Sequence, residues 1–341
     1  MTPQDSRIPR PGGTDSLVDV PGLCVGQVEL GANEATPDGA TGVTAVVAPD
    51  GALGAVDVRG GAPGTRETDA LSPLASGERV HAVLIVGRSV FGLAAADGAT
   101  TELERRGIGI VVEAEVGRLT VPIVAAAVVF DFSHGEPSVR PGPDDGRRAV
   151  TVALDGGRGR PRRGNAGAGT GASIGGIAGE RAKGGVGHAS LALPVEAGTL
   201  VVGALAVVNA AGTLTNPSTG RLWAEAGGFG RPGQAPDFSR IVAARGQTTI
   251  GVIGTNARLS KAQLAQVAGM AHDGIARAIR PAHTGVDGDA VFALGVPDGA
   301  DTPAVEAHRW GSAAVSIVGS LAADALTRAI LDAVGRGRGA V

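Results

Sequence analysis

The sequence predicts a mixed α/β fold with several strands buried on both faces. Short β-branched runs bounded by glycine or proline recur along the chain, and other segments have apolar residues at helical spacing. Hydrophobic residues make up 43% of the chain, yet aromatic residues make up 2% and tyrosine is absent. Such small side chains favour closely spaced layers. The 57 glycines follow no collagen-like period and therefore mark turns and close backbone approaches.

The expected helices have recognisable boundaries. Gly107 is a stop signal for the first helix, and Ser260 with Gln263 forms a capping box that opens the second. The third is long and rich in alanine. No internal repeat is present. The expected helices are 93–106, 260–280 and 312–334, and the expected strands are 43–48, 55–58, 82–86, 109–112, 123–130, 149–154, 200–209, 248–254 and 289–295.

Composition limits the classes of function. A chain of 341 residues forms one large domain or two ordinary ones. A net charge of −3 and a pI near 6.1 argue against a nucleic-acid partner. The lone Cys24 excludes an internal disulfide framework and suits a reducing compartment. No signal peptide is visible, and the apolar runs at 121–130 and 200–209 are too short to span a bilayer. We expect a cytoplasmic protein without a membrane partner.

Two glycine-rich patterns overlap in the middle of the chain. Residues 167–172 satisfy the glycine-x-glycine-x-x-alanine dinucleotide pattern, but the flanking sequence indicates neither the strand nor the helix that this site requires. Gly171-Ala172-Ser173-Ile174-Gly175 matches the nucleophile elbow of α/β-hydrolases, and Asp287 and His308 follow in the order of that triad. A serine hydrolase that uses Ser173 is therefore an open alternative, although the surrounding glycines disfavour an elbow.

Metal or cofactor chemistry has little support in the sequence. No two histidines stand at positions i and i+4, the spacing that places two ligands on one helix face. We therefore expect neither a metal nor a cofactor, and interpret each histidine as a surface or hydrogen-bonded structural residue. The six histidines are His81, His134, His188, His272, His283 and His308.

A hydroxyl nucleophile is one interpretation of the C-terminal part. Thr248 begins an expected strand, and Asp287-Gly288-Asp289 leads into another. A threonine at a new N-terminus carries its own base, since a free α-amine titrates at about pH 7.7–8.0. Paired acids can orient that amine and hydroxyl. On spacing alone, however, an Asp-Gly-Asp loop is more often a turn with two solvated carboxylates.

A series of motifs in this sequence resembles one known family. The most specific is Arg59-Gly60-Gly61-Ala62-Pro63-Gly64-Thr65-Arg66-Glu67-Thr68-Asp69. The series resembles the self-processing aminopeptidases and amidases that include L-aminopeptidase D-amidase/D-esterase, the β-peptidyl aminopeptidases and the 6-aminohexanoate-oligomer (nylon-oligomer) hydrolase. The likeness covers almost the whole chain. The other motifs that carry it lie at 20–26, 42–44, 89–93, 96–98, 130–132, 165–172 and 183–187.

The resemblance implies a four-layer α/β/β/α sandwich similar to that of N-terminal nucleophile hydrolases, with a different strand connectivity. It implies one domain, 1–341, preceded by a flexible tail over 1–17 and cut between Gln247 and Thr248 into fragments 1–247 and 248–341. On this chain the implied site consists of the nucleophile Thr248, the oxyanion donor Asn209, the pocket lysine Lys183, and the positioning acids Asp287 and Asp289.

Three positions depart from the family pattern. Gln247 stands where close relatives have asparagine, and its carbonyl is the one attacked during self-cleavage. Arg88 stands where glycine is common, and Phe91 stands where some members place a tyrosine near the substrate; both bear on the choice of substrate. A threonine nucleophile with Asp-x-Asp resembles the nylon-oligomer hydrolase pattern more than that of the serine aminopeptidases, which carry Ser-x-Glu.

The sequence thus predicts an amide hydrolase for small peptides or peptide-like oligomers, with 6-aminohexanoate oligomers among the candidates. Thr248 would form an acyl-enzyme, assisted by its own α-amine and Lys183. The resemblance also implies a homo-oligomer of processed units. The glycine- and proline-rich stretch at 219–240 reads as an exposed connector ahead of the cut. Two alternatives remain open: the Ser173 hydrolase, and an unprocessed binding or scaffold protein with an inactive site, for which Gln247 is the best argument.

Overall fold

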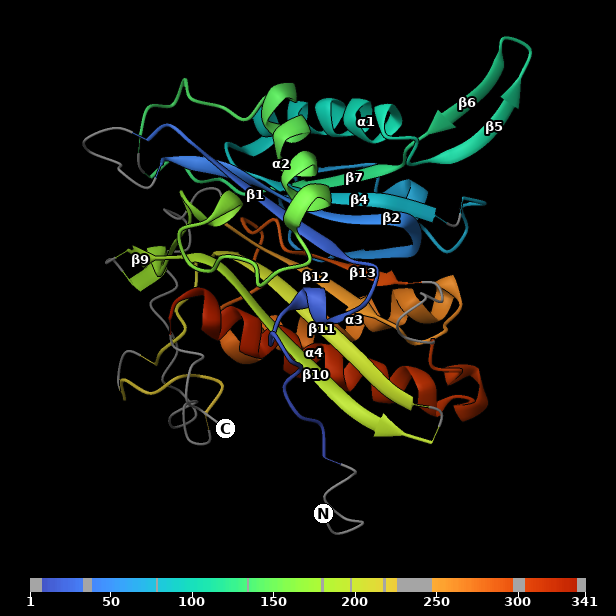
Figure 1. Ribbon diagram of the computed structural model, residues 1–341. Coiled ribbons are helices and arrows are strands. Elements are labelled where there is room, and N and C mark those ends of the chain that lie inside the picture. The colour runs from blue at the N-terminus through green and yellow to red at the C-terminus, as the bar shows by residue number, and fades with distance from the viewer. Residues whose placement is uncertain are drawn as a thin grey trace.

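The protein folds as two sheet layers with helices on both outer faces. The computed structural model describes residues 8–32, 39–77, 79–133, 135–178, 181–196, 198–216, 219–225, 247–296 and 304–335. In Figure 1, α1 and α2 lie above the strands and α3 and α4 lie below them. The predicted α/β/β/α sandwich is therefore confirmed. The helices are α1 (Ala95–Arg105), α2 (Pro143–Gly156), α3 (Lys261–Ala278) and α4 (Ala313–Ala333).

The main sheet runs in the order β10-β11-β12-β13-β2-β4-β7-β3, with β1 paired to β2. Two separate two-stranded sheets pair β5 with β6 and β8 with β9. The strands are β1 (Cys24–Leu30), β2 (Thr41–Val58), β3 (Thr65–Arg66), β4 (Arg79–Val86), β5 (Ile110–Ala114), β6 (Gly117–Val121), β7 (Val124–Val128), β8 (Ser173–Ile174), β9 (Ala182–Lys183), β10 (Gly185–Val195), β11 (Gly198–Asn209), β12 (Thr248–Thr255) and β13 (Ala290–Gly295).

One long strand, β2, joins the two layers. Its first part pairs with β1 and β4, and its last part, Leu53–Val58, pairs with β13. The register with β4 shifts between Val47 and Ala52, which is a bulge that bends the strand. The sequence predicts two strands here, 43–48 and 55–58, because Asp50 and Gly51 interrupt the apolar pattern. The structure instead continues a single strand through them.

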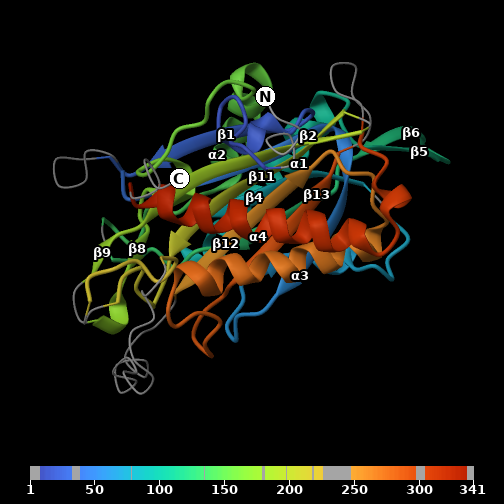
Figure 2. The ribbon, with the colours of Figure 1, turned by 90° about the horizontal axis from the view of Figure 1, so that it is seen from below.

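Three apolar cores separate the four layers. The core between the sheets is formed by side chains such as Val83, Ile85, Leu205, Val252 and Phe292. A second core lies between β10–β13 and the helices α3 and α4, and a third lies between β1, β2, β4, β7 and the helices α1 and α2. Figure 2 shows α3 and α4 side by side across the lower sheet layer. α4 is long and apolar enough to cross a membrane, but 61% of its apolar window is buried, as in a core helix.

The expected strand at 149–154 is wrong. These residues lie within α2, which begins with Pro143 in its first turn and ends next to Gly157. The Gly142 N–H donates to Asp145 Oδ2 at 3.0 Å, so the acid caps the first turn. The β-branched run suggested a strand, but Ala149, Val150 and Ala153 are buried at helical spacing against neighbouring elements. Burial of this stripe outweighs the local β propensity.

Two predicted helix boundaries are confirmed: the end of α1 at Gly107 and the start of α3 at Ser260. Gly107 follows α1 with a φ of +72°, a left-handed conformation that favours glycine. The Gln263 N–H donates to Ser260 Oγ at 3.2 Å, and the Ser260 N–H donates to Gln263 Oε1 at 2.9 Å. This reciprocal pair is the capping box that the sequence predicts for α3.

The described part of the predicted tail is packed against the body. Arg10 and Ala192 exchange two main-chain hydrogen bonds of 3.0 and 2.7 Å. Asp15 accepts an ion-paired hydrogen bond from Arg328 at 2.9 Å, and Leu17 is fully buried. Residues 1–7 lie outside the described residues, as do 226–240 of the expected connector.

Candidate active site

Thr248 is the first residue of β12 and lies opposite Asn209, the last residue of β11. Both side chains are buried, with exposed fractions of 5% and 0%. The antiparallel ladder between β11 and β12 ends at this pair. Thr248 begins β12 where Asn209 ends β11, so the antiparallel pairing brings together two residues that lie far apart in the sequence.

The peptide bond before Thr248 is held from two sides. Thr248 Oγ1 donates to the Gln247 carbonyl oxygen at 2.6 Å, and the Gly288 N–H donates to the same oxygen at 2.9 Å. A side chain at Gly288 is excluded, since a Cβ there would lie 2.8 Å from Thr248 Oγ1 and 3.0 Å from the Ala62 carbonyl. The Gln247 carbonyl oxygen, at the predicted cleavage site, therefore accepts two donors, one of them the hydroxyl of the predicted nucleophile.

The side chain of Gln247 is also fixed. It is 2% exposed, and its amide nitrogen reaches the carbonyl oxygens of Asn209 and Ala210, each at 3.1 Å. These two acceptors are satisfied by an amide N–H₂ and not by an oxygen. The Gln247 side chain thus ties the residue before the predicted cleavage site to the end of β11.

Asp289 binds the main chain that follows the nucleophile. Its Oδ1 accepts the Thr249 N–H at 2.6 Å, while Oδ2 accepts the His283 N–H at 3.0 Å and lies 2.9 Å from His283 Nδ1. The carboxyl group is 2% exposed. With donors on both oxygens, the Asp289 carboxylate is held beside Thr249, and its role as a positioning acid stays a prediction.

Asp287 is a buried acid with a different environment. Its Oδ2 accepts the Thr284 N–H at 2.8 Å and the Thr284 Oγ1–H at 2.6 Å. Burial, followed by the nearby charge of Asp289, raises the pKa of Asp287 to about 6. At neutral pH the group is nevertheless a carboxylate.

The raised pKa of Asp287 predicts a stability effect. The folded protein binds this proton more tightly than the unfolded chain, so the ionised group destabilises the fold above about pH 6, and the penalty disappears toward pH 4. Asp287→Asn keeps an acceptor for Thr284 and is expected to raise the free energy of unfolding at pH 7 by roughly 2 kcal/mol. Urea unfolding at pH 7 and pH 4.5 measures this. A gain equal at both pH values would contradict the assignment.

The Asn209 amide is held by two main-chain groups. Its Nδ2 donates to the Phe130 carbonyl at 3.1 Å, and its Oδ1 accepts the Ser173 N–H at 2.9 Å. This orientation is fixed, because exchanging oxygen and nitrogen would oppose like groups at both contacts. An amide nitrogen carries two hydrogens, and one N–H of Asn209 Nδ2 donates to the Phe130 carbonyl oxygen, so a second N–H remains.

Lys183 is bound to the glycine-rich loop. Its Nζ donates to the carbonyl oxygens of Gly169 and Ala172 at 3.1 Å each, and also to that of Thr170. An amine that donates to three carbonyl oxygens is a protonated ammonium. The geometry therefore favours charge stabilisation and loop positioning for Lys183 over removal of a proton. The residue after Ala172 is Ser173, whose N–H orients Asn209.

The nucleophile-elbow geometry is not formed at Ser173. This residue begins the two-residue strand β8, which is preceded by a 3₁₀ turn at 167–169 and followed by one at 176–178. An elbow needs a buried strand before the serine and a helix after it. The same turns replace the strand and helix of a dinucleotide site. Asp287, the predicted triad acid, binds Thr284 instead.

The motif that begins at Arg59 contacts the loop that carries Asp287 and Asp289. The Arg59 and Gly60 N–H groups donate to the Asp289 carbonyl at 3.0 and 3.1 Å, and the Ala62 N–H donates to the Asp287 carbonyl at 2.8 Å. A Cβ at Gly60 would lie 2.3 Å from the Asp287 carbonyl oxygen. Glycine is therefore required where these two backbones touch.

Phe91 and Arg88 occupy different environments. Phe91 is 51% exposed and stacks under Arg140, whose guanidinium carbon lies 3.7 Å from the ring centroid. No contact of Phe91 with Thr248 or Asn209 is among the described interactions, so its substrate role stays a prediction. Arg88 is fully buried, has a φ of +62°, and donates to the Asp131 carbonyl at 2.8 Å.

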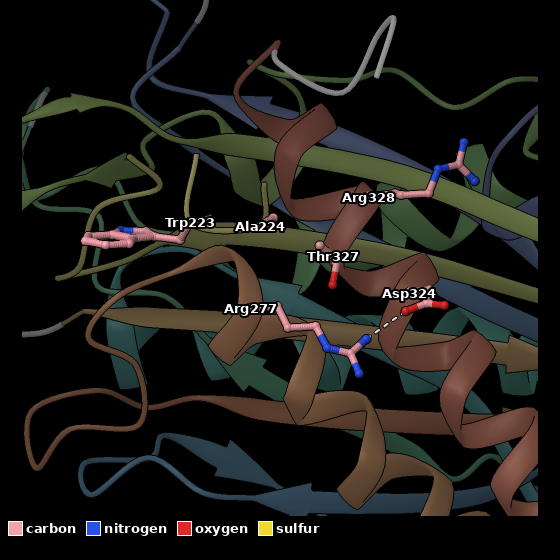
Figure 3. Close-up of a pocket in the computed structure, with 6 residues that line it drawn as sticks. All are labelled: Trp223, Ala224, Arg277, Asp324, Thr327 and Arg328. Atoms are coloured by element: carbon pink, nitrogen blue, oxygen red, sulfur yellow. Dashed lines mark hydrogen bonds and ion pairs between the residues drawn. The ribbon is translucent and has the colours of Figure 1, made fainter. Parts of the chain in front are cut away.

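A separate pocket lies on the outer face of the helices. It has a volume of about 300 Å³ and is bounded by α3, α4 and the segment at 223–224. Figure 3 shows the Arg277–Asp324 ion pair of 2.7 Å between the two helices. None of the predicted catalytic residues lines it. Over the described ranges, no group of three or more His, Cys, Asp or Glu side chains gathers as metal ligands would.

The sequence matches one known peptidase family over almost its whole length. The model of Peptidase family S58 matches residues 15–339. The chain belongs to this family. An uncharacterized aminopeptidase of Mycobacterium tuberculosis is 43% identical over 94% of this chain and 93% of its own length. A 6-aminohexanoate-oligomer endohydrolase of Kocuria sp. is 31% identical over 95% and 87%, respectively. As a member of family S58, the protein is a peptidase or amide hydrolase.

The fold of this S58 peptidase is also that of solved structures. The L-aminopeptidase D-Ala-esterase/amidase from Ochrobactrum anthropi superposes with a TM-score of 0.69 at 21% identity, covering 96% of this chain and 87% of that one. That structure is described as a variant of the Ntn hydrolase fold. The fold class expected from the resemblance is therefore confirmed.

The S58 site contains two groups that the sequence did not single out. The His283 main-chain N–H donates to Asp289 Oδ2, which the ring Nδ1 also contacts, and the Gly288 N–H donates to the Gln247 carbonyl oxygen. Gly288 lies in the quoted Asp287-Gly288-Asp289 stretch, where a glycine between two acids was a signal for a close backbone approach. A lone histidine gave no comparable signal.

Proposed function

We propose that this S58 peptidase cuts its own chain between Gln247 and Thr248 and then hydrolyses amide bonds with Thr248 as an N-terminal nucleophile. The observation that carries the proposal is the double contact at the Gln247 carbonyl oxygen, which accepts both Thr248 Oγ1 and the Gly288 N–H. Because the Thr248 hydroxyl is hydrogen-bonded to the Gln247 carbonyl oxygen, it lies beside the carbonyl group that it must attack. The second donor is aimed at the oxygen where negative charge develops.

Self-cleavage proceeds by an N-to-O acyl shift. Thr248 Oγ1 attacks the Gln247 carbonyl carbon, and the oxyanion is stabilised by the Gly288 N–H, a type of contact worth roughly 3–4 kcal/mol. The C–N bond then breaks and its nitrogen takes up a proton, which leaves an ester between Gln247 and Thr248. Water hydrolyses that ester to a Gln247 carboxylate and a Thr248 hydroxyl with a free α-amine.

Substrate hydrolysis uses the amine that cleavage releases. The Thr248 α-amine accepts the hydroxyl proton as Oγ1 attacks the substrate carbonyl. The second N–H of Asn209 Nδ2 stabilises the resulting oxyanion, and collapse expels the amine product. Water then releases the acyl group from Thr248. Asp289 holds the Thr249 amide in place during both steps, while Lys183 holds the loop that orients Asn209.

We propose small peptides or peptide-like oligoamides as the substrates. The support is the aminopeptidase and the 6-aminohexanoate-oligomer endohydrolase to which the chain is similar. A homo-oligomer of processed units in the cytoplasm is part of the same proposal. Its support on the surface is the β5–β6 hairpin, which projects from the body in Figure 1 and exposes Val111, Val112, Val116, Leu119 and Val121.

Intact-mass measurement with N-terminal sequencing tests the proposal directly. The purified protein is expected to give two fragments under denaturing conditions, the second beginning Thr-Thr-Ile-Gly, from one 33.5 kDa precursor. A chain that never divides would favour the inactive scaffold. The native mass of the same sample gives the number of processed units in the oligomer.

A further inference from the structure

We propose that His283 is a positioning residue for the reaction: its ring and its main-chain N–H fix Asp289, and Asp289 fixes the peptide that follows the nucleophile. This inference rests on the proposed role of Thr248. His283 Nδ1 lies 2.9 Å from Asp289 Oδ2, and its main-chain N–H donates to the same oxygen at 3.0 Å. One residue thus supplies both donors to one carboxylate oxygen.

The other Asp289 oxygen is the link to the nucleophile. Oδ1 accepts the Thr249 N–H at 2.6 Å, and this amide belongs to the peptide plane that carries the Thr248 carbonyl. Holding the plane fixes the backbone torsion of Thr248 on its C-terminal side. A carboxylate fixed at only one oxygen can rotate, whereas one held at both transmits its position to Thr249.

The backbone of His283 is arranged for this contact. Its φ is +56°, in the left-handed region that non-glycine residues rarely adopt. This conformation turns the N–H and the ring toward the same acceptor. A carboxylate only accepts hydrogen bonds, so Nδ1 carries the hydrogen in this contact.

Apart from Asp289, the surroundings of the His283 ring offer no partner that requires an imidazole among the described residues. His283 Nε2 is buried without a hydrogen-bond partner among the described residues, and so is Nδ1 of the neighbouring His272. The two rings meet edge to face with centroids 4.7 Å apart, and His272 Nε2 lies 3.0 Å from the Asp57 carbonyl. A buried nitrogen without a partner is unfavourable, so an apolar ring would pack better here. What the imidazole adds is the Nδ1–H bond to Asp289.

The test separates the side chain of His283 from its backbone conformation. His283→Gly relieves the left-handed φ and keeps the main-chain N–H, but it removes the ring donor. His283→Asn also tolerates this φ and places an N–H₂ at the same distance from the backbone as Nδ1. The rate of self-cleavage is followed by denaturing electrophoresis, and kcat and KM are measured on a peptide amide after processing.

We expect His283→Gly to slow self-cleavage and kcat by roughly tenfold to hundredfold with KM little changed, because the reacting groups lose their alignment. His283→Asn is expected to restore both rates to within about threefold of the unmodified protein. The double variant His283→Gly with Asp289→Asn should be no slower than Asp289→Asn alone, since the two residues act in one chain of contacts. His81→Asn, which also removes a buried imidazole, is the matched control and should leave both rates unchanged.

The outcomes are distinguishable. If the unmodified chain divides before Thr248 and His283→Gly does so at the same rate, the role of His283 is overturned and the proposed function stands. If Thr248→Ala still divides at this bond, the proposed function fails and the His283 proposal fails with it. Circular dichroism checks folding. If the glycine variant does not fold, His283→Phe, which keeps a ring without a donor, is compared with His283→Asn, and equal rates for these two would overturn the proposal.

Discussion

Thr248→Ala is expected to remain one uncut chain of about 33.5 kDa and to lose hydrolysis by roughly 10⁴-fold or more. The alanine lacks the Oγ1 that lies 2.6 Å from the Gln247 carbonyl oxygen, so neither the acyl shift nor the acyl-enzyme can form. The side chain is small and 5% exposed, and its removal leaves the strand pairing with β11 in place. Intact mass and turnover of a peptide amide measure the two losses.

Two variants act as controls for this result. Thr248→Ser keeps the hydroxyl and should still divide. Thr249→Ala changes the next buried threonine, whose contact with Asp289 uses only its main-chain N–H, and should divide as the unmodified chain does. Division of the Thr248→Ala chain at the same bond would exclude Thr248 as the nucleophile. Loss of turnover in Ser173→Ala with normal turnover in Thr248→Ala would instead establish the Ser173 hydrolase.

Asn209→Ala is expected to lower kcat for amide hydrolysis by roughly 10²–10³-fold. The amide donates to Phe130 and accepts from Ser173, so it is held in place on the residue that pairs with Thr248, and one N–H of Nδ2 is left for the proposed oxyanion. Removing it deletes the oxyanion donor of the hydrolytic step. Self-cleavage should be less affected, because the Gly288 N–H serves the Gln247 carbonyl. Single-turnover cleavage and steady-state turnover are compared in the same preparation.

The chain offers a close control for Asn209. Asn256 is also buried, at 2%, and its amide likewise bridges two main-chain groups, accepting from Val201 at 2.8 Å and donating to Thr199 at 2.9 Å. It lies at the opposite end of the β11–β12 ladder. Both Asn256→Ala and Asn209→Ala should lower the free energy of unfolding by about 1–3 kcal/mol, because each leaves buried main-chain groups without a partner. Only Asn256→Ala should keep the kcat of the unmodified protein. Equal losses of kcat in both variants would reduce the Asn209 effect to one of stability.

Local signals in the sequence predicted the elements that depend on local chemistry. The capping box at Ser260 and the stop at Gly107 lie where they were expected because each acts within one helical turn. The segment at 149–154 was misassigned because its β-branched residues favour a strand, whereas burial against α1 and β1, which are distant in sequence, makes it a helix. The continuity of β2 through Asp50 and Gly51 is likewise set by its pairing partners.

In the candidate site, too, local sequence patterns could not predict what depends on residues distant in sequence. Thr248, Asn209 and the acids at 287 and 289 came from motif resemblance, and no spacing rule relates positions that meet only through strand order. The structure adds what depends on atomic contacts: His283 contacts Asp289, and the Gly288 N–H donates to the Gln247 carbonyl oxygen. It also assigns the ammonium of Lys183 to the loop carbonyls, which the sequence could not indicate because a lysine at a strand end is ordinarily solvated.

The order of strands in the main sheet determines whether the protein can refold after the proposed cut. If the chain is cut before Thr248 as proposed, β12 and β13 belong to the second fragment, yet they lie between β11 and β2, which belong to the first. The two products are therefore interleaved within one sheet, and neither can leave without breaking the ladders on both sides. Before the cut, the chain folds in a first-order process; after it, unfolded halves must find each other at second order. A molecule processed as proposed would thus depend on a folding event that it cannot repeat alone, and its lifetime would be set by the rate at which the sheet opens.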